Sequence, residues 1–290
     1  MLKLNVFILL LFFTSSCFSF TFEDTALVNG FAKGYALTSD QDGLETAQKN
    51  PAGITTLSNS KFQTSYTSYF DDAYQTLNFS YGKKINSNYV IGFQIPTRLI
   101  NDILETQADE SGEGIQVSSF SDSTYQAIFS LGKVVNSSLT VGANIKGYYR
   151  KLYNQTGNYY GLDLGAQYKT SYGVIGASFQ DINSKMNWDS GQSESIPMQS
   201  NLGMSITCIP SFIVLADYSS SSERTELNSG LSWFAHNMIT IHAGLKSILE
   251  DPRFSLGLSL QSIGFSFDYA YSKHEYLGTI HKVGVSVNVN

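Results

Sequence analysis

The sequence predicts an all-β fold, a transmembrane antiparallel β-barrel of about 14 strands with an N-terminal plug, or hatch, in its lumen. From Lys61 to the C-terminus, apolar and polar residues alternate. The alternating segments are about ten residues long, which is the length of a strand that crosses a membrane at a tilt. The preceding stretch, Gly30 to Leu57, does not alternate and contains four glycines. We therefore expect this stretch to be the plug and the alternating segments to be the wall.

The composition favours a wall between lipid and water. Of the 290 residues, 42% are hydrophobic, 13% are aromatic and only 14% are charged. Soluble globular proteins have about a quarter of their residues charged. Ser, Asn, Thr, Gln and Gly take the place of charged residues here, and such neutral side chains suit a barrel lumen. The net charge of −6 argues against a nucleic-acid partner, which requires a basic patch.

Residues 1–19 have the pattern of a secretory signal peptide. Lys3 supplies the positive start, and Val6–Phe13 is an apolar core that is too short to span a bilayer as a helix, which takes about 20 residues. Small residues at Cys17 and Ser19 favour cleavage after Ser19. A lipoprotein cleaved before Cys17 is the alternative. Either way, we expect an exported protein.

The expected wall extends from residue 59 to residue 290 and contains about fourteen alternating segments. A bacterial single-chain barrel needs an even number of strands. Aromatic residues gather near segment ends, where interfacial girdles lie in such barrels. The expected segments are 60–70, 74–84, 87–97, 123–133, 138–150, 157–169, 172–182, 198–207, 210–219, 224–234, 238–247, 253–261, 263–272 and 280–289.

The connections between segments differ in length according to whether they follow an odd-numbered or an even-numbered segment. The longest, Arg98–Asp122 and Asn183–Pro197, follow the third and seventh segments, whereas connections after even segments are short. Long outer loops and short inner turns are typical of outer-membrane barrels, so we expect these two stretches to be outer loops. The first is acidic. We interpret it as a solvated surface loop rather than a calcium site, because its spacing does not match an EF-hand loop.

The sequence carries no motif of an enzyme, a cofactor site or a metal site. It has no P-loop, no dinucleotide-binding glycine pattern and no Cys/His cluster with metal-ligand spacing. Cys208, the single cysteine after the signal peptide, is expected to be a small apolar filler. Six ionisable residues alternate with the apolar residues expected to face lipid, so we expect their side chains to point into the lumen. Mutual pairing that stiffens the wall is the favoured interpretation, and a polar path past the plug is the alternative. They are Lys146, Asp163, His242, Lys246, Asp268 and Lys282.

Several motifs resemble a known family. Residues 42–57, DGLETAQKNPAGITTL, resemble the N-terminal Asn-Pro-Ala-Gly segment of the FadL-like superfamily of outer-membrane barrels, and in particular its PorV/PorQ-like branch. Residues 160–166, 176–182 and 277–284 resemble the middle and closing strands of that branch. The resemblance implies a fourteen-stranded barrel with a hatch in the lumen. It places four candidate plug or ligand-gating residues in the hatch: Asn50, Pro51, Ala52 and Gly53.

The expected function follows from the barrel and the resemblance together. Residues 1–19 form the signal peptide, 20–58 the hatch and 59–290 the barrel, which passively transports small hydrophobic compounds across the outer membrane. Expected partners are outer-membrane lipid and a hydrophobic small molecule. One alternative, implied by the PorV-like resemblance, is a non-transporting adaptor of a protein secretion or surface-attachment system, with exported proteins as partners. Another is a secreted soluble β-protein. The terminal residue, Asn290, differs from the aromatic residue common at the end of such barrels.

Overall fold

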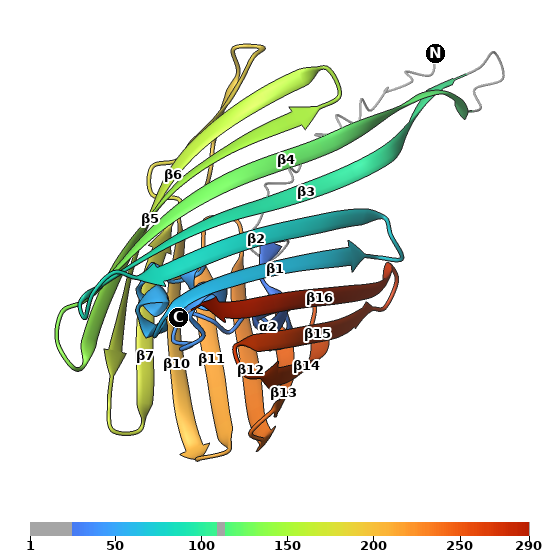
Figure 1. Ribbon diagram of the computed structural model, residues 1–290. Coiled ribbons are helices and arrows are strands. Elements are labelled where there is room, and N and C mark those ends of the chain that lie inside the picture. The colour runs from blue at the N-terminus through green and yellow to red at the C-terminus, as the bar shows by residue number, and fades with distance from the viewer. Residues whose placement is uncertain (1–24, 109–113, 290) are drawn as a thin grey trace, which may run out of the picture.

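The computed structural model describes residues 25–108 and 114–289, so the predicted signal peptide lies outside the described residues. Sixteen strands form one sheet, and all of them except β8 and β9 make a wall of fourteen antiparallel strands. Because β1 pairs with β16, the wall closes into a barrel (Figure 1). The wall strands are β1 (Ser60–Tyr69), β2 (Tyr74–Lys84), β3 (Tyr89–Ala108), β4 (Gly114–Val134), β5 (Leu139–Leu152), β6 (Gln155–Lys169), β7 (Gly173–Gln180), β10 (Gln199–Ile209), β11 (Phe212–Ser220), β12 (Thr225–His236), β13 (Ile239–Lys246), β14 (Arg253–Ser262), β15 (Phe265–His274) and β16 (Gly278–Val289).

The predicted fourteen-stranded barrel is confirmed, but the prediction that 98–122 is an outer loop is wrong. The described part of this stretch continues β3 and β4 as one hairpin, paired as far as Ala108 and Gly114. A bulge interrupts the hairpin between Ile100 and Ile103, where Asp102 has a φ of 56°. Acidic residues suggested a loop, yet β-branched and amide residues between them support a strand. Asn183–Pro197 also contains strands, β8 (Lys185–Trp188) and β9 (Ser193–Ser195), which extend the edge of β6.

The two faces of the wall reverse the pattern of a soluble protein. Outward side chains are apolar and exposed, as in Phe129 (62% exposed) and Ile145 (68%). Inward neighbours such as Gln94 and Asn144 are fully buried. Soluble proteins instead bury apolar side chains and expose polar ones. An apolar outer face around a polar interior is the arrangement of a barrel that crosses a membrane.

The N-terminal segment, residues 25–58, lies inside the barrel (Figure 1). It forms helices α2 (Val28–Ala32) and α3 (Gly43–Ala47) and the 3-10 helix η1 (Pro51–Thr56). In the described part of the chain, no helix is long and apolar enough to cross a membrane. Much of the buried apolar core of the molecule lies between this segment and the wall.

The two ends of the barrel differ. Strand β1 begins and strand β16 ends at the same end, which we call the terminal end, and short turns such as 85–88 and 170–172 lie there. The opposite end, which we call the far end, carries the long β3–β4 hairpin and the β8–β9 hairpin. The expected sorting of connections is thus present, although the long connections are hairpins rather than irregular loops.

Candidate functional site in the barrel lumen

Polar side chains of the wall hold the N-terminal segment by its backbone. Gln94 Nε2 donates to the Leu44 carbonyl at 2.9 Å, and Asn144 Nδ2 donates to the Ala47 carbonyl at 2.9 Å. The short helices of the segment leave most backbone carbonyls without an internal partner, and buried carbonyls need one. Further donors of this kind are Asn78 to Thr25, Ser178 to Lys49, Gln180 to Gln48, Ser205 to Ser39, Ser255 to Ala32 and Lys282 to Ala26.

The Asn-Pro-Ala-Gly turn sits against β6 and β7 and begins η1. Asn50 is the N-cap of this helix, and its Oδ1 accepts a hydrogen bond from the Ala52 amide at 3.1 Å. Its Nδ2 donates to the carbonyls of Thr38, at 2.7 Å, and Ala166, at 3.1 Å. Pro51 occupies the first helical position, where its missing N–H costs nothing. The four residues of this turn are buried, and their proposed role in gating stays a prediction.

Two facing glycines make room for this turn. Gly142 of β5 pairs with Gly165 of β6. A Cβ on Gly142 would lie 2.4 Å from the Pro51 carbonyl carbon, and a Cβ on Gly165 would lie 2.0 Å from Asn50 Oδ1. Any larger residue at either position would displace the segment or the wall. The glycines on the polar face of the predicted strands are the sequence signal of this close approach.

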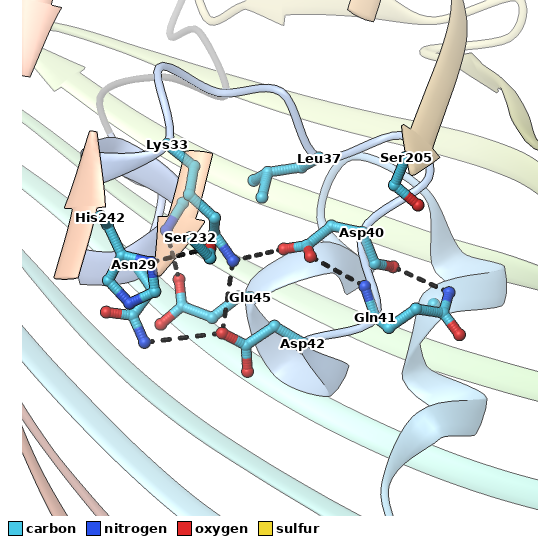
Figure 2. A network of polar contacts seen from close by, with 12 residues as sticks. Asn29, Lys33, Leu37, Asp40, Gln41, Asp42, Glu45, Ser205, Ser232 and His242 are labelled. Carbon is cyan, nitrogen blue, oxygen red and sulfur yellow. Dashed lines mark hydrogen bonds and ion pairs between the residues drawn. The ribbon is translucent and has the colours of Figure 1, made fainter. Parts of the chain in front are cut away.

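A buried ion cluster lies within the N-terminal segment (Figure 2). Lys33 Nζ lies 2.5 Å from Asp40 Oδ2 and 3.5 Å from Asp42 Oδ2. Asp42 also lies 3.9 Å from Lys61 Nζ on β1. Burial by itself would raise the pKa of Asp42, but Lys33 and Lys61 outweigh burial and lower the pKa to about 2. Asp42 is therefore a carboxylate at neutral pH.

Glu45 is the titratable member of the cluster. Its Oε2 accepts a hydrogen bond from the Gly30 amide at 3.0 Å, and its Oε1 accepts one from Gln63 Nε2 at 2.5 Å. Burial and the negative charge of Asp42 raise the pKa of Glu45 to about 7, even though Lys33 opposes this shift. Glu45 therefore changes its charge near neutral pH, at the place where α3 meets α2.

The six luminal residues singled out from the sequence all point inward, and two of them, Lys146 and Asp163, form an ion pair with each other. Lys146 pairs with Asp163 at 2.8 Å and with Asp181 at 2.5 Å. His242 lies between Ser232 Oγ, at 2.9 Å, and Ser259 Oγ, at 3.2 Å. Asp268 accepts a hydrogen bond from Ser266, Lys246 lies 3.9 Å from Glu226, and Lys282 donates to the Ala26 carbonyl. The residues therefore do not form one site.

A cavity of about 500 Å³ lies between the N-terminal segment and the far end of the barrel. Aromatic rings form much of its lining. Tyr69 and Tyr74 stack with ring centroids 4.4 Å apart, and Phe31 meets Tyr35 edge to face. The sequence reasoning missed this cavity. Its lining comes from α2 and from strand ends far apart in the chain, and the inward phase of those aromatic residues is the only sequence signal.

Basic side chains surround the same cavity: Arg98, Arg150, Arg224, Lys246 and Arg253. Arg150 holds Asp122 through two hydrogen bonds, of 2.9 and 2.7 Å, and Arg98 lies 3.4 Å from the same carboxylate. Glu226 is shared by Arg224 and Lys246, and Asp251 lies beside Arg253. Of the described residues that line the cavity, five are basic and one, Asp122, is acidic, so most charged side chains of this lining are cationic.

Cysteine and metal-ligating residues form no second site in the described part of the chain. Cys208, which we expected to be a small apolar filler, is exposed. Its position near the end of β10 explains this exposure. Among residues 25–108 and 114–289, no group of three or more His, Cys, Asp or Glu side chains is arranged to hold a metal ion.

Solved structures of transport proteins share this fold. No family model and no curated protein matches the chain. The TodX monoaromatic hydrocarbon channel deltaS2 mutant is 13% identical, covers 93% of this chain and 100% of its own, and has a TM-score of 0.69. The Ralstonia pickettii toluene transporter TbuX is 13% identical, with coverages of 91% and 97% and a TM-score of 0.67. A Pseudomonas aeruginosa FadL homologue is 13% identical, with coverages of 92% and 99% and a TM-score of 0.61. The chain has the barrel fold of these proteins.

Proposed function

We propose that this protein is an outer-membrane channel through which small hydrophobic compounds pass passively, and that the N-terminal segment is its plug. The observation that carries the proposal is the aromatic-lined cavity of about 500 Å³ on the far side of this segment. Its size lies in the range of small-molecule sites, about 300–1,000 Å³. The names of the structural neighbours, a monoaromatic hydrocarbon channel and a toluene transporter, support the same class of compound.

The charged residues of the cavity narrow the chemical class of the expected ligand. Aromatic rings such as those of Tyr69, Tyr74 and Phe31 give the cavity an apolar surface, and the basic side chains of its lining suit a ligand that carries a negative group. An apolar molecule that carries one acidic group satisfies both features. We therefore expect the cavity to bind such an acid more tightly than the corresponding neutral hydrocarbon.

The plug extends over residues 20–58 in this proposal, after a signal peptide of residues 1–19 and before the barrel of residues 59–290. The Asn50–Gly53 turn is proposed as the gating element, because it contacts the wall mainly through the Asn50 side chain and two glycine recesses. The luminal ionisable residues are proposed to line a polar path beside the plug. The PorV/PorQ-like branch and the adaptor role stay predictions.

Uptake by proteoliposomes tests the proposal. The full chain and a variant without residues 30–57 are reconstituted, and uptake of a labelled alkylbenzoic acid is measured together with the conductance for potassium chloride. We expect the full chain to take up the acid with low conductance, because the plug fills the lumen. We expect the deletion to raise the conductance by about tenfold or more, because an unplugged lumen of this width admits water and ions.

A folding control accompanies this experiment. Both proteins must migrate as folded barrels on a gel without heating and shift on heating. If the folded deletion variant takes up the acid and conducts ions as the full chain does, the N-terminal segment is not a plug. If neither protein takes up the acid, the cavity is not part of a transport path.

A further inference from the structure

The hairpin of β3 and β4 projects beyond the rest of the wall (Figure 1). The pairing of β2 with β3 ends at Gln75 and Leu99, and the pairing of β4 with β5 ends at Asp122 and Leu152. Past these residues β3 and β4 pair only with each other among the described strands. We call residues 100–108 and 114–121 the arm. At 3.3 Å per residue, it extends about 30 Å beyond its neighbours with both edges open.

The open edges lack lysine and proline, two of the usual protections against strand addition, although bulges interrupt the hairpin at Ile100–Ile103 and Glu105–Thr106. Natural proteins protect edges with lysine, proline or a covering loop. The sequence from Leu99 to Gly132 contains no Lys, Arg or Pro. Leu104 (58% exposed) and Ile115 (50%) are bare apolar side chains on the arm. An edge of this kind is a template for an extended segment of another chain.

The charge along the β3 edge restricts what can add to it. On the arm, Asp102 is exposed and Glu105 is half-buried. The turn between β1 and β2 carries Asp71 and Asp72, and it lies just before Gln75, the β2 residue that pairs with Leu99 at the base of the arm. No lysine or arginine lies between Phe62 and Gly82, so these acidic residues are uncompensated within their own segments. A second copy of the arm would place acid beside acid, which destabilises strand pairs.

We propose that the free edge of β3, residues 100–108, binds an extended segment of another polypeptide that carries lysine or arginine, by adding it as a strand. Backbone hydrogen bonds supply the binding, and the acidic residues select the basic partner. This surface lies outside the apolar band of the barrel, so it is available to a chain in solution. The proposal is independent of transport through the lumen.

Binding of defined peptides to the full chain in detergent tests the proposal. The probes are eight-residue peptides in which threonine and valine alternate with lysine, matched peptides with glutamate in place of lysine, and a lysine peptide with alternate N-methylated amides. Fluorescence anisotropy measures the affinities. We expect the lysine peptide to bind at least about tenfold more tightly than the glutamate peptide. N-methylation should abolish its binding, because the methyl groups remove backbone donors.

Two variants locate the binding. Asp102→Asn combined with Glu105→Gln should remove the preference for lysine. A shortened hairpin, in which an Asn-Gly turn replaces residues 101–120, should abolish binding. The matched control is a chain in which the β8–β9 hairpin (residues 185–195) is shortened in the same way, and it should bind the lysine peptide normally.

Three outcomes would overturn the proposal. The first is no binding of the lysine peptide up to about 1 mM. The second is binding that persists in the shortened hairpin, which would place the peptide elsewhere. The third is a dimer of the full chain, seen by sedimentation and lost when residues 101–120 are removed, which would make the arm a contact between two copies of the protein.

Discussion

At the scale of single residues, the close packing of the N-terminal segment against the wall depends on glycines. Gly142 and Gly165 face each other on β5 and β6, and the Asn50–Pro51 peptide rests against both. The Asn50–Gly53 motif could be predicted from the sequence, because a cap and the proline after it are neighbours in the chain. The place where this motif contacts the wall could not be predicted, because it depends on which glycines of β5 and β6 pair with each other.

Replacing Gly142 with alanine should loosen the N-terminal segment. The new Cβ would lie 2.4 Å from backbone atoms of Pro51, which cannot move aside as a flexible side chain would. We expect a loss of about 1–3 kcal/mol in the free energy of unfolding, as for other overpacked cores. Faster hydrogen exchange of residues 43–57 would report the loosening.

Gly147→Ala on the same strand is the matched control for this prediction, because its Cβ would meet its nearest neighbour at 3.7 Å. It should leave both the unfolding free energy and the exchange unchanged. Equal effects of the two substitutions would mean that the contact with Pro51 does not matter for stability.

Glu45 should make the stability of the protein depend on pH. Burial and Asp42 raise the pKa of Glu45 from 4.5 to about 7 in the folded protein, so the folded state binds the proton more tightly than the unfolded state. The contribution of Glu45 is therefore most favourable below about pH 4.5, and stability is lost as pH rises toward 7 and stays low above it. The loss is on the order of 1–3 kcal/mol.

The Glu45→Gln variant checks this pH dependence. As pH rises from 5 to 8, the unfolding free energy of this variant should increase relative to that of the wild type, because its amide does not titrate. Glu223→Gln, in the exposed turn after β11, should keep the wild-type dependence. Wild-type and Glu45→Gln curves that run parallel over this range would contradict the assigned role of Glu45.

At the scale of elements, the period of two predicts the wall strands well. Alternate side chains of a wall strand face lipid and a polar lumen, so they must differ in polarity. The strand is therefore visible as an alternating pattern in the sequence. Predicted segments such as 60–70 and 74–84 match β1 (Ser60–Tyr69) and β2 (Tyr74–Lys84) closely. Beyond the rim no such constraint acts on β3 and β4. Both faces of the arm meet solvent, and its strands could not be distinguished from an acidic loop.

Removing the arm should leave the barrel stable. Its packing against the rest of the described chain includes the contact of Phe120 with Tyr153, whose ring centroids are 5.2 Å apart, and it buries little apolar surface. We expect the shortened hairpin, with an Asn-Gly turn in place of residues 101–120, to shift the thermal midpoint by only a few degrees. Heat-dependent gel mobility would measure this. Failure of the shortened chain to assemble would show that the arm is part of the folding unit.

At the scale of the whole molecule, the cavity combines parts that no single stretch of sequence contains. Arg98 comes from β3 and Arg150 from β5, Lys246 comes from β13, and Phe31 comes from α2. Only closure of the barrel with the segment inside brings them together. The sequence therefore predicted a closed barrel with a polar lumen but not this cavity.

The basic residues that line the cavity predict a preference among ligands. Isothermal titration of the detergent-solubilised protein should show that an alkylbenzoic acid binds at least about tenfold more tightly than the alkylbenzene of equal chain length. Lys246→Met should weaken binding of the acid but not of the neutral compound. Lys273→Met, an exposed lysine that does not line the cavity, is the control. Equal affinities for the acid and the hydrocarbon would contradict the electrostatic part of the proposed function.

The most direct test asks whether the N-terminal segment controls passage through the lumen. Ser259 Oγ of β14 donates to Asn29 Oδ1 of α2 at 3.0 Å, so cysteines at these two positions lie within reach of a short bis-methanethiosulfonate reagent, which joins them through reducible disulfide bonds. With Cys208 replaced by Ser, uptake of labelled alkylbenzoic acid by proteoliposomes is measured with this cross-link formed and after its reduction. We predict that forming it slows uptake by about tenfold or more and that reduction restores the rate. The same uptake rate in both states would contradict the account, because the compound would then cross without movement of the segment.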